Sequence, residues 1–158
     1  MDKIIKRNEK LAFYKVNSTY KRMRGFTEFA MNKNPKEYQR KYIDEETQRN
    51  DIVGYNPSIS FSFDRFSEDD VHTDMVAIAD NEKVGSGAVR SIMIVDTSKT
   101  TEGSGCSAQL REFSVIPDSE GNDTDTYTYS GTLKANGDLK FGYATSTDNW
   151  QTAEFTEA

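Results

Sequence analysis

The chain has few cysteines and histidines and no long apolar run, which disulfide-rich, histidine-rich metal-binding and membrane proteins require. Its 158 residues include one cysteine and one histidine, so they form no internal disulfide and no multi-histidine metal centre, although carboxylate metal sites remain open. The longest apolar runs, such as residues 92–95, are far shorter than the ~20 residues that span a bilayer. Lys6 and Arg7 interrupt the apolar pair before them, so we expect no secretory signal. These absences predict a soluble protein, made in a reducing cytoplasm or released from one.

Length and composition indicate one domain over residues 1–158. A chain of this length, with 35% apolar residues, needs no disulfide framework or structural metal, because it buries about 68–70% of its unfolded surface.

Charge is distributed unevenly along the chain. Residues 1–50 hold 13 Lys and Arg against 7 Asp and Glu, a balance of +6, and residues 51–158 hold 7 against 19, a balance of −12. The basic part is compatible with a nucleic-acid partner, but the acidic remainder would repel phosphate. Self-association through opposite charges and an unevenly charged, solvated surface both remain open.

Strand-like patterns dominate the sequence. Ile59, Phe61 and Phe63 alternate with polar residues, which is typical of a strand with one buried face. Residues 89–97 carry consecutive apolar side chains, which indicates a strand covered on both faces. Further strands are predicted at residues 11–16, 23–31, 107–116, 125–135, 138–147 and 150–156. About eight strands at this spacing are typical of a β-sandwich or barrel.

The segments on either side of residues 135–137 suggest a hairpin. With Gly137 in the left-handed region, Leu133 would face Leu139 and Tyr129 would face Tyr143. A shift by one position would set Leu133 against a lysine, so we expect the first register.

One helix is expected at residues 68–82. Ser67 is a suitable N-cap, and the three acidic residues after it favour the positive end of the helix dipole. Lys83 and Gly85 favour termination. Apolar residues recur at helical spacing, namely Val71, Met75, Ile78 and Ala79.

Residues 32–56 are polar and highly charged and show no core pattern. They nevertheless contain Tyr38, Tyr42 and Ile43. A disordered insertion and an arm that orders against another subunit are both compatible with this composition.

No residue pattern indicates catalysis. His72 is the only possible histidine base and has no Gly-x-Ser-x-Gly nucleophile, so we expect it at a surface or boundary. Cys106 follows a Gly/Ser-rich connection without a neighbouring base. Residues 118–125 resemble a calcium loop but lack its full pattern, so a solvated hairpin loop is favoured. We expect no catalytic, cofactor-binding or metal site and no enzyme activity.

Seven short stretches, spread over nearly the whole chain, carry a resemblance to one family. They are residues 3–14 (KIIKRNEKLAFY), 24–29 (RGFTEF), 33–38 (KNPKEY), 42–46 (YIDEE), 53–58 (VGYNPS), 111–121 (REFSVIPDSEG) and 129–133 (YSGTL). These stretches resemble phage tail tube proteins, also called major tail proteins, of prophages in Gram-positive bacteria.

The resemblance implies a mainly β fold, with two packed antiparallel sheets in a β-sandwich or barrel-like tail-tube arrangement and one flanking α-helix. In that family, subunits close into hexameric rings that stack into a tube around an acidic lumen for DNA passage. The implied partners are further copies of the chain, a tape-measure protein, tail terminator or baseplate proteins, and a sheath protein if the tail is contractile. DNA would pass without specific binding, and no membrane is involved. The implied location is the virion tail, assembled from protein made in the host bacterial cytoplasm.

The resemblance also assigns two arms that reach neighbouring subunits. One is an N-terminal arm at about residues 1–16, and the other is a polar loop or hairpin at about residues 32–56. The candidate inter-subunit residues are Lys3, Lys6, Arg7, Lys36, Tyr38, Arg40, Lys41 and Tyr42.

Two other functions remain open. A β-sandwich carbohydrate-binding module would need an aromatic platform, for which Trp150, Tyr127 and Tyr143 are candidates. A carboxylate hydrolase would need two cooperating acids, and nothing in the sequence selects them.

Overall fold

The computed structural model describes residues 2–100 and 105–158. Its elements follow in this order: the 3₁₀ helix η1 (Arg7–Glu9), β1 (Lys10–Val16), β2 (Thr19–Arg22), β3 (Phe26–Asn32), β4 (Pro35–Arg40), β5 (Arg49–Tyr55), β6 (Ser58–Asp64), α1 (Asp70–Asp80), the 3₁₀ helix η2 (Gly85–Ala88), β7 (Val89–Thr100), β8 (Cys106–Glu120), β9 (Thr128–Ala135), β10 (Lys140–Thr145) and β11 (Thr152–Glu157).

Most strands belong to one antiparallel sheet of nine, in the order β10-β11-β2-β1-β7-β8-β9-β6-β3, while β4 and β5 form a separate pair. The first residues of β8 pair with β10, and its later residues pair with β9. The β8–β10 pairing closes one end of the sheet into a small barrel, and the other end continues through β9 and β6 to β3. The predicted fold class, mainly β with one flanking helix, is confirmed.

Two hydrophobic cores lie on opposite faces of the central strands. In β7, Ile92 belongs to the core that α1 covers, and Met93 belongs to the core inside the small barrel. Successive side chains of a strand point to opposite faces, so consecutive apolar residues are needed where both faces are covered. The prediction of a doubly covered strand at residues 89–97 is confirmed.

The larger core forms between the sheet and α1. Ile59, Phe61 and Phe63 of β6 are buried in it, and their polar neighbours along the strand are only partly buried. The predicted period-two strand is therefore confirmed. Val71 and Met75 pack into the same core from α1, and each such buried side chain contributes about 1.5–3 kcal/mol by the hydrophobic effect.

The helix is shorter than the sequence predicts and has a different cap. Asp69, not Ser67, is the N-cap, and its carboxylate accepts a hydrogen bond from the His72 amide at 3.1 Å. A second Asp69 oxygen lies 2.7 Å from Arg24 Nε. The carboxylate can serve both partners, whereas a serine hydroxyl cannot form this ion pair. The chain leaves the helix at Asn81, before the expected end at residue 82.

The predicted β9–β10 hairpin is wrong. In β9, Leu133 pairs with Ile59 of β6 on one side and with Val115 of β8 on the other, so neither edge of β9 is free for β10. Residues 136–139 instead carry the chain from β9 to the barrel. A Cβ built on Gly131 would lie 2.3 Å from the backbone oxygen of Ile116, so a glycine is needed because β8 passes so closely.

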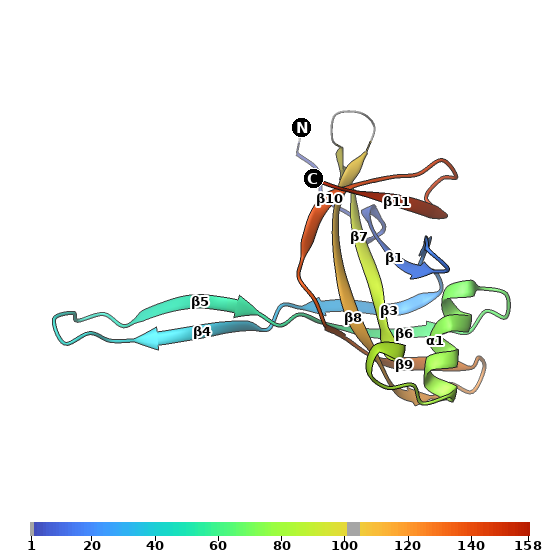
Figure 1. The fold of residues 1–158 in the computed structure, drawn as a ribbon, viewed down its shortest axis with the longest axis horizontal. Helices are drawn as coiled ribbons and strands as arrows, with labels where there is room; N and C mark the ends of the chain where they lie inside the picture. Colours follow the sequence, from blue (N-terminus) through green and yellow to red (C-terminus); the bar gives the residue numbers. More distant parts are fainter. Residues whose placement is uncertain (1, 101–104) are drawn as a thin grey trace.

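β2 was not expected as a separate strand, and β4 and β5 form a hairpin within the segment expected as a polar loop or hairpin. β2 follows a tight turn in which Asn17 and Ser18 both have positive φ, 49° and 68°, the backbone geometry of a two-residue hairpin. The strands β4 and β5 show no buried face and so no hydrophobic period. Figure 1 shows this pair extending as a long hairpin away from the rest of the molecule. No helix in the described part of the chain is long and apolar enough to cross a bilayer.

Candidate assembly surface

The β4–β5 hairpin, residues 35–55, is the most exposed part of the described structure. All of β4 is exposed, and in β5 only Gly54 is partly buried. Tyr38 pairs with Asp51, and the register shifts by one residue between Lys36 and Glu37. A two-stranded hairpin without further packing is marginally stable in water. The hairpin therefore gains little stability from packing within the described chain.

Large apolar side chains lie exposed along this hairpin. They are Tyr38, Tyr42, Ile43, Ile52, Val53 and Tyr55. Single exposed apolar residues are common on protein surfaces, but a group of six on one projecting element is typical of an interaction surface.

Charged side chains brace the hairpin near its tip. Arg49 Nε lies 3.1 and 3.0 Å from the two carboxylate oxygens of Glu45 and donates to both. The Arg49 guanidinium also lies 5.7 Å from the centre of the Tyr42 ring, and that of Arg40 lies 5.0 Å from the Tyr38 ring. These contacts offset the repulsion expected between Arg40 and Arg49, which are directly opposite in the ladder.

The second half of the predicted N-terminal arm is part of the body. β1 begins at Lys10, and Phe13 and Tyr14 are completely buried, so only residues 2–9 lie outside the sheet, and Met1 lies outside the described residues. Arg7 fastens this segment, because its guanidinium donates to the backbone oxygens of Lys10 at 2.9 Å and Phe29 at 3.2 Å.

The predicted arm residues fall into two separate groups. Lys3, Lys6 and Arg7 lie in the N-terminal segment, where Lys3 pairs with Glu9 at 3.2 Å. The Lys6 amide and the Lys3 ammonium lower the pKa of Glu9. The hairpin group is Lys36, Tyr38, Arg40, Lys41 and Tyr42, and Figure 1 shows that the hairpin extends away from the body that carries the N-terminus.

The charge asymmetry does not belong to the hairpin. Residues 32–56 hold 5 Lys and Arg and 5 Asp and Glu, so this segment carries no net charge. The positive balance of residues 1–50 comes largely from the N-terminal segment and from the first strands of the body. Charge attraction along the whole hairpin is therefore not a sufficient basis for self-association.

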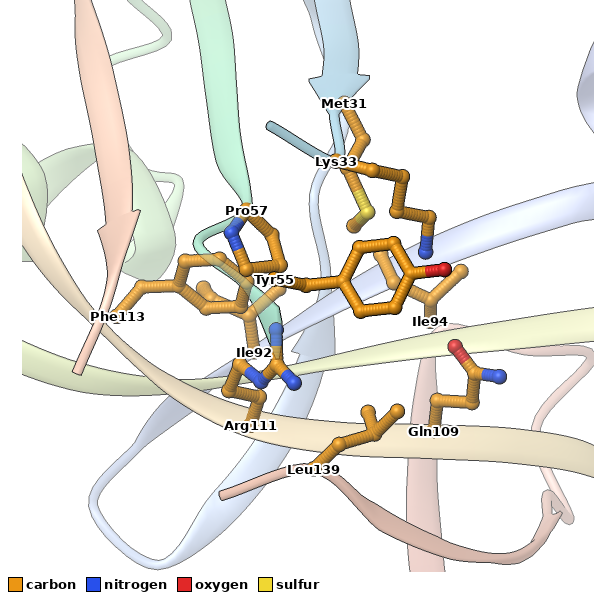
Figure 2. Close-up of a pocket in the computed structure, with 10 residues that line it drawn as sticks. All are labelled: Met31, Lys33, Tyr55, Pro57, Ile92, Ile94, Gln109, Arg111, Phe113 and Leu139. Carbon is orange, nitrogen blue, oxygen red and sulfur yellow. The ribbon is translucent and has the colours of Figure 1, made fainter. Parts of the chain in front are cut away.

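A cavity of about 270 Å³ lies at the base of the hairpin. Figure 2 shows its walls, which come from β3, the end of β5, β7, β8 and the segment before β10. The lining residues are Met31, Lys33, Tyr55, Pro57, Ile92, Ile94, Gln109, Arg111, Phe113 and Leu139. Most of this surface is apolar, and the buried Nε of Arg111 has no hydrogen-bond partner within residues 2–100 and 105–158.

His72 is buried in the larger core, contrary to its expected place at a surface or boundary. Its side chain is 0% exposed and stacks on Phe63 at 4.5 Å between ring centres. The Phe66 amide donates to Nδ1 at 3.1 Å, so the proton lies on Nε2, which donates to the Arg24 backbone oxygen at 2.7 Å. Burial lowers the pKa of this imidazole. Its spacing of three residues from Met75 is the sequence signal that places it on the inner helix face.

The other candidate chemical groups do not assemble into a reactive site. No three His, Cys, Asp or Glu side chains in the described ranges could hold a metal together. Cys106 is the buried first residue of β8, and burial raises the pKa of its thiol. β8 extends through residue 120, so the expected loop at 118–125 begins as a strand. The Gly/Ser-rich residues 101–104 lie outside the described residues.

Two of the three aromatic residues considered for carbohydrate binding, Trp150 and Tyr127, lie apart. Trp150 packs against Phe13 in the barrel core, with ring centres 6.1 Å apart. Tyr127 lies beyond the end of β9, where it donates to Glu120 at 2.9 Å and packs against Tyr129. The two rings belong to different parts of the molecule and do not form one platform.

Comparison with known proteins gives information at the level of the fold. No protein family model matches the chain, and no curated protein sequence does. One similar chain comes from a structure described as "Cryo-EM structure of the anti-feeding prophage (AFP) baseplate, 6-fold symmetrised", with a TM-score of 0.53 and 10% identity. The two chains share a fold. The match covers 89% of this chain and 97% of that chain, and at this identity it carries no information on activity.

Proposed function

We propose that this protein is a structural subunit of a phage or phage-like tail tube and has no enzymatic activity. The observation that carries the proposal is the shared fold with a chain of a six-fold symmetrised prophage baseplate, matched over 97% of that chain. The exposed β4–β5 hairpin supports it, because a subunit that functions alone gains nothing from six exposed apolar side chains on a projecting element.

Ring formation would use surfaces that the single chain leaves unpaired. β3 ends the nine-stranded order, and β4 and β5 pair only with each other among the described strands. Open strand edges readily pair with strands of another chain. Six copies that contact one another head to tail, with a rotation that closes, form a hexameric ring, and such rings stack into a tube.

The acidic remainder of the chain suits a channel through which DNA passes. Residues 57–158 hold 7 Lys and Arg against 18 Asp and Glu, and carboxylates that face a lumen repel phosphates and prevent DNA from adhering. The proposed partners are further copies of this chain, a tape-measure protein, and the terminator or baseplate proteins at the tube ends. The proposed location is the tail of a virion or a phage-like particle.

Negative-stain electron microscopy of the purified protein tests this function. The expected result is six-fold rings or tubes, formed alone or after addition of tail components. A protein that remains monomeric at high concentration, and does not assemble with tail components, would contradict the proposal.

A further inference from the structure

The tip of the hairpin presents one aliphatic side chain to solvent. The amide of Glu45 donates to the backbone oxygen of Tyr42 at 3.1 Å, which closes a β-turn with Ile43 at its second position. Ile43 is fully exposed. The residue after it is Asp44, so the turn presents an apolar group and a carboxylate side by side.

Side-chain contacts link both ends of this tip to β5. Arg49 bonds both carboxylate oxygens of Glu45 and lies over the Tyr42 ring, so both ends of the turn are fixed to β5. The Glu45 carboxylate is therefore paired with Arg49, whereas Asp44 forms no ion pair within the part of the chain that the structure describes. A turn restrained by such contacts loses less conformational entropy on docking than an unrestrained one.

The cavity at the base of the hairpin offers the complementary chemistry. Its volume is about 270 Å³, which is far more than a single water molecule needs. Ile92, Phe113 and Leu139 contribute apolar walls. Figure 2 shows the Arg111 guanidinium directed from β8 toward Tyr55 and Pro57.

Arg111 requires a partner that the described residues do not supply. Its Nε is buried and makes no hydrogen bond in residues 2–100 and 105–158. A buried donor without an acceptor is unfavourable, and a carboxylate is the strongest acceptor for a guanidinium. Lys33 lies on the same rim, so the cavity favours an occupant that is apolar with an adjoining negative charge.

The tip and the cavity of one chain cannot meet. Ile43 lies eight residues beyond Pro35, which is about 26 Å along a strand at 3.3 Å per residue, and Figure 1 shows the hairpin extended away from its base. An occupant with the chemistry of the tip must therefore come from another copy.

We propose that the hairpin tip of one copy docks into the cavity at the hairpin base of the next copy. Ile43 enters between the apolar walls, and the Asp44 carboxylate accepts hydrogen bonds from Arg111. This contact joins two different surfaces, so it repeats head to tail around a closed ring or between stacked rings. The inference rests on the self-assembly proposed above and specifies the site of contact.

Disulfide cross-linking between two single variants tests the docking. Ile43→Cys is mixed with Leu139→Cys under mild oxidation, and cross-linked peptides are identified by mass spectrometry. A disulfide between positions 43 and 139 is expected, and it joins two copies because each chain carries only one of the changes. Val84→Cys is the matched control, since Val84 is also exposed but belongs to neither proposed arm and should not cross-link to position 139.

Charge exchange tests the ion pair separately. Asp44→Arg changes an exposed side chain, and it should raise the concentration needed for assembly by about tenfold or more. Arg111→Glu should have the same effect, and the combination of both changes should restore assembly. Glu68→Arg, at an exposed site before the helix, controls for the change in net charge.

The outcomes separate this inference from the proposed function. Rings that form normally with Asp44→Arg, and give no disulfide between positions 43 and 139, overturn the docking and leave the tail-tube function standing. Failure of the unaltered chain to assemble overturns both.

Discussion

Phe63 of β6 and Ile52 of β5 are both large apolar residues on antiparallel strands, yet their surroundings differ. Phe63 is 1% exposed and lies between His72 and Tyr129, whereas Ile52 is 59% exposed and faces Glu37 across the hairpin. The body is stabilised by burial within the chain. The apolar groups of the hairpin stay largely exposed within the described chain, which is what the proposed contacts between copies require.

The largest effect should come from truncation in the body. Phe63→Ala should reduce the free energy of unfolding by about 3–5 kcal/mol, because it removes a ring from the larger core and leaves a cavity. Ile52→Ala should change it by less than about 0.5 kcal/mol, as exposed substitutions do. Urea unfolding of the monomer, followed by circular dichroism, measures both. Similar losses for the two variants would show that the hairpin packs on the body.

Substitutions at two glycines, one in the body and one in the hairpin, test the same difference between these two regions. Gly131→Ala places a Cβ 2.3 Å from the backbone oxygen of Ile116, so the strands must move apart at a cost of about 1–3 kcal/mol. Gly54 of the hairpin has no described atom within 4 Å of the corresponding position, and Gly54→Ala should be neutral or stabilise by up to about 1 kcal/mol. Thermal unfolding distinguishes them. A neutral Gly131→Ala would contradict the close approach of β8 and β9.

His72 should make the stability of the body depend on pH. Burial lowers its pKa below 6.5, with Arg65 and Arg24 acting in the same direction and the Arg24 carbonyl and Asp69 opposing. The unfolded chain therefore binds a proton first, and stability falls as pH decreases from about 6.5 to the folded-state pKa, by at most about 1.4 kcal/mol per pH unit.

His72→Gln should remove that slope, whatever its effect on stability at neutral pH. Urea unfolding between pH 7 and 5 provides the measurement. A slope that persists in His72→Gln would assign the effect to another group.

Shortening the hairpin should have little effect on the stability of the monomer. Pro35 and Tyr55 are paired at its base, so residues 36–54 can be replaced by an Asn-Gly turn, which favours a tight hairpin. The free energy of unfolding should change by less than about 1 kcal/mol, since the hairpin adds little to either core. A large loss would show that the hairpin contributes to folding.

The strands and the helix of the body can be predicted from the sequence where their buried residues follow a local period. Alternation at Ile59 to Phe63 and the consecutive apolar residues of β7 identify their strands because each position faces a fixed core. The apolar stripe at helical spacing likewise identifies the helix. Its cap at Asp69 could not be predicted from a local pattern, because the ion pair that favours it involves Arg24, which is distant in sequence.

Pairing between distant strands could not be predicted in this way. β8 pairs with β10 along its first residues and with β9 along its later residues. Because β9 lies between β8 and β6, it has no free edge for β10, and the expected contact between Leu133 and Leu139 does not form. The family resemblance assigned an arm at about residues 32–56, but local patterns identified neither its strands nor the cavity at its base. β4 and β5 bury no face and leave no hydrophobic period, and the cavity beside Arg111 collects residues from five separate segments.

Sedimentation velocity tests most directly the central claim that the hairpin serves contacts between copies. The full chain and the variant shortened between Pro35 and Tyr55 are compared over a wide concentration range. The full chain should form rings or larger assemblies above a threshold concentration, while the shortened variant remains monomeric throughout. The same size distribution for both chains would contradict the claim.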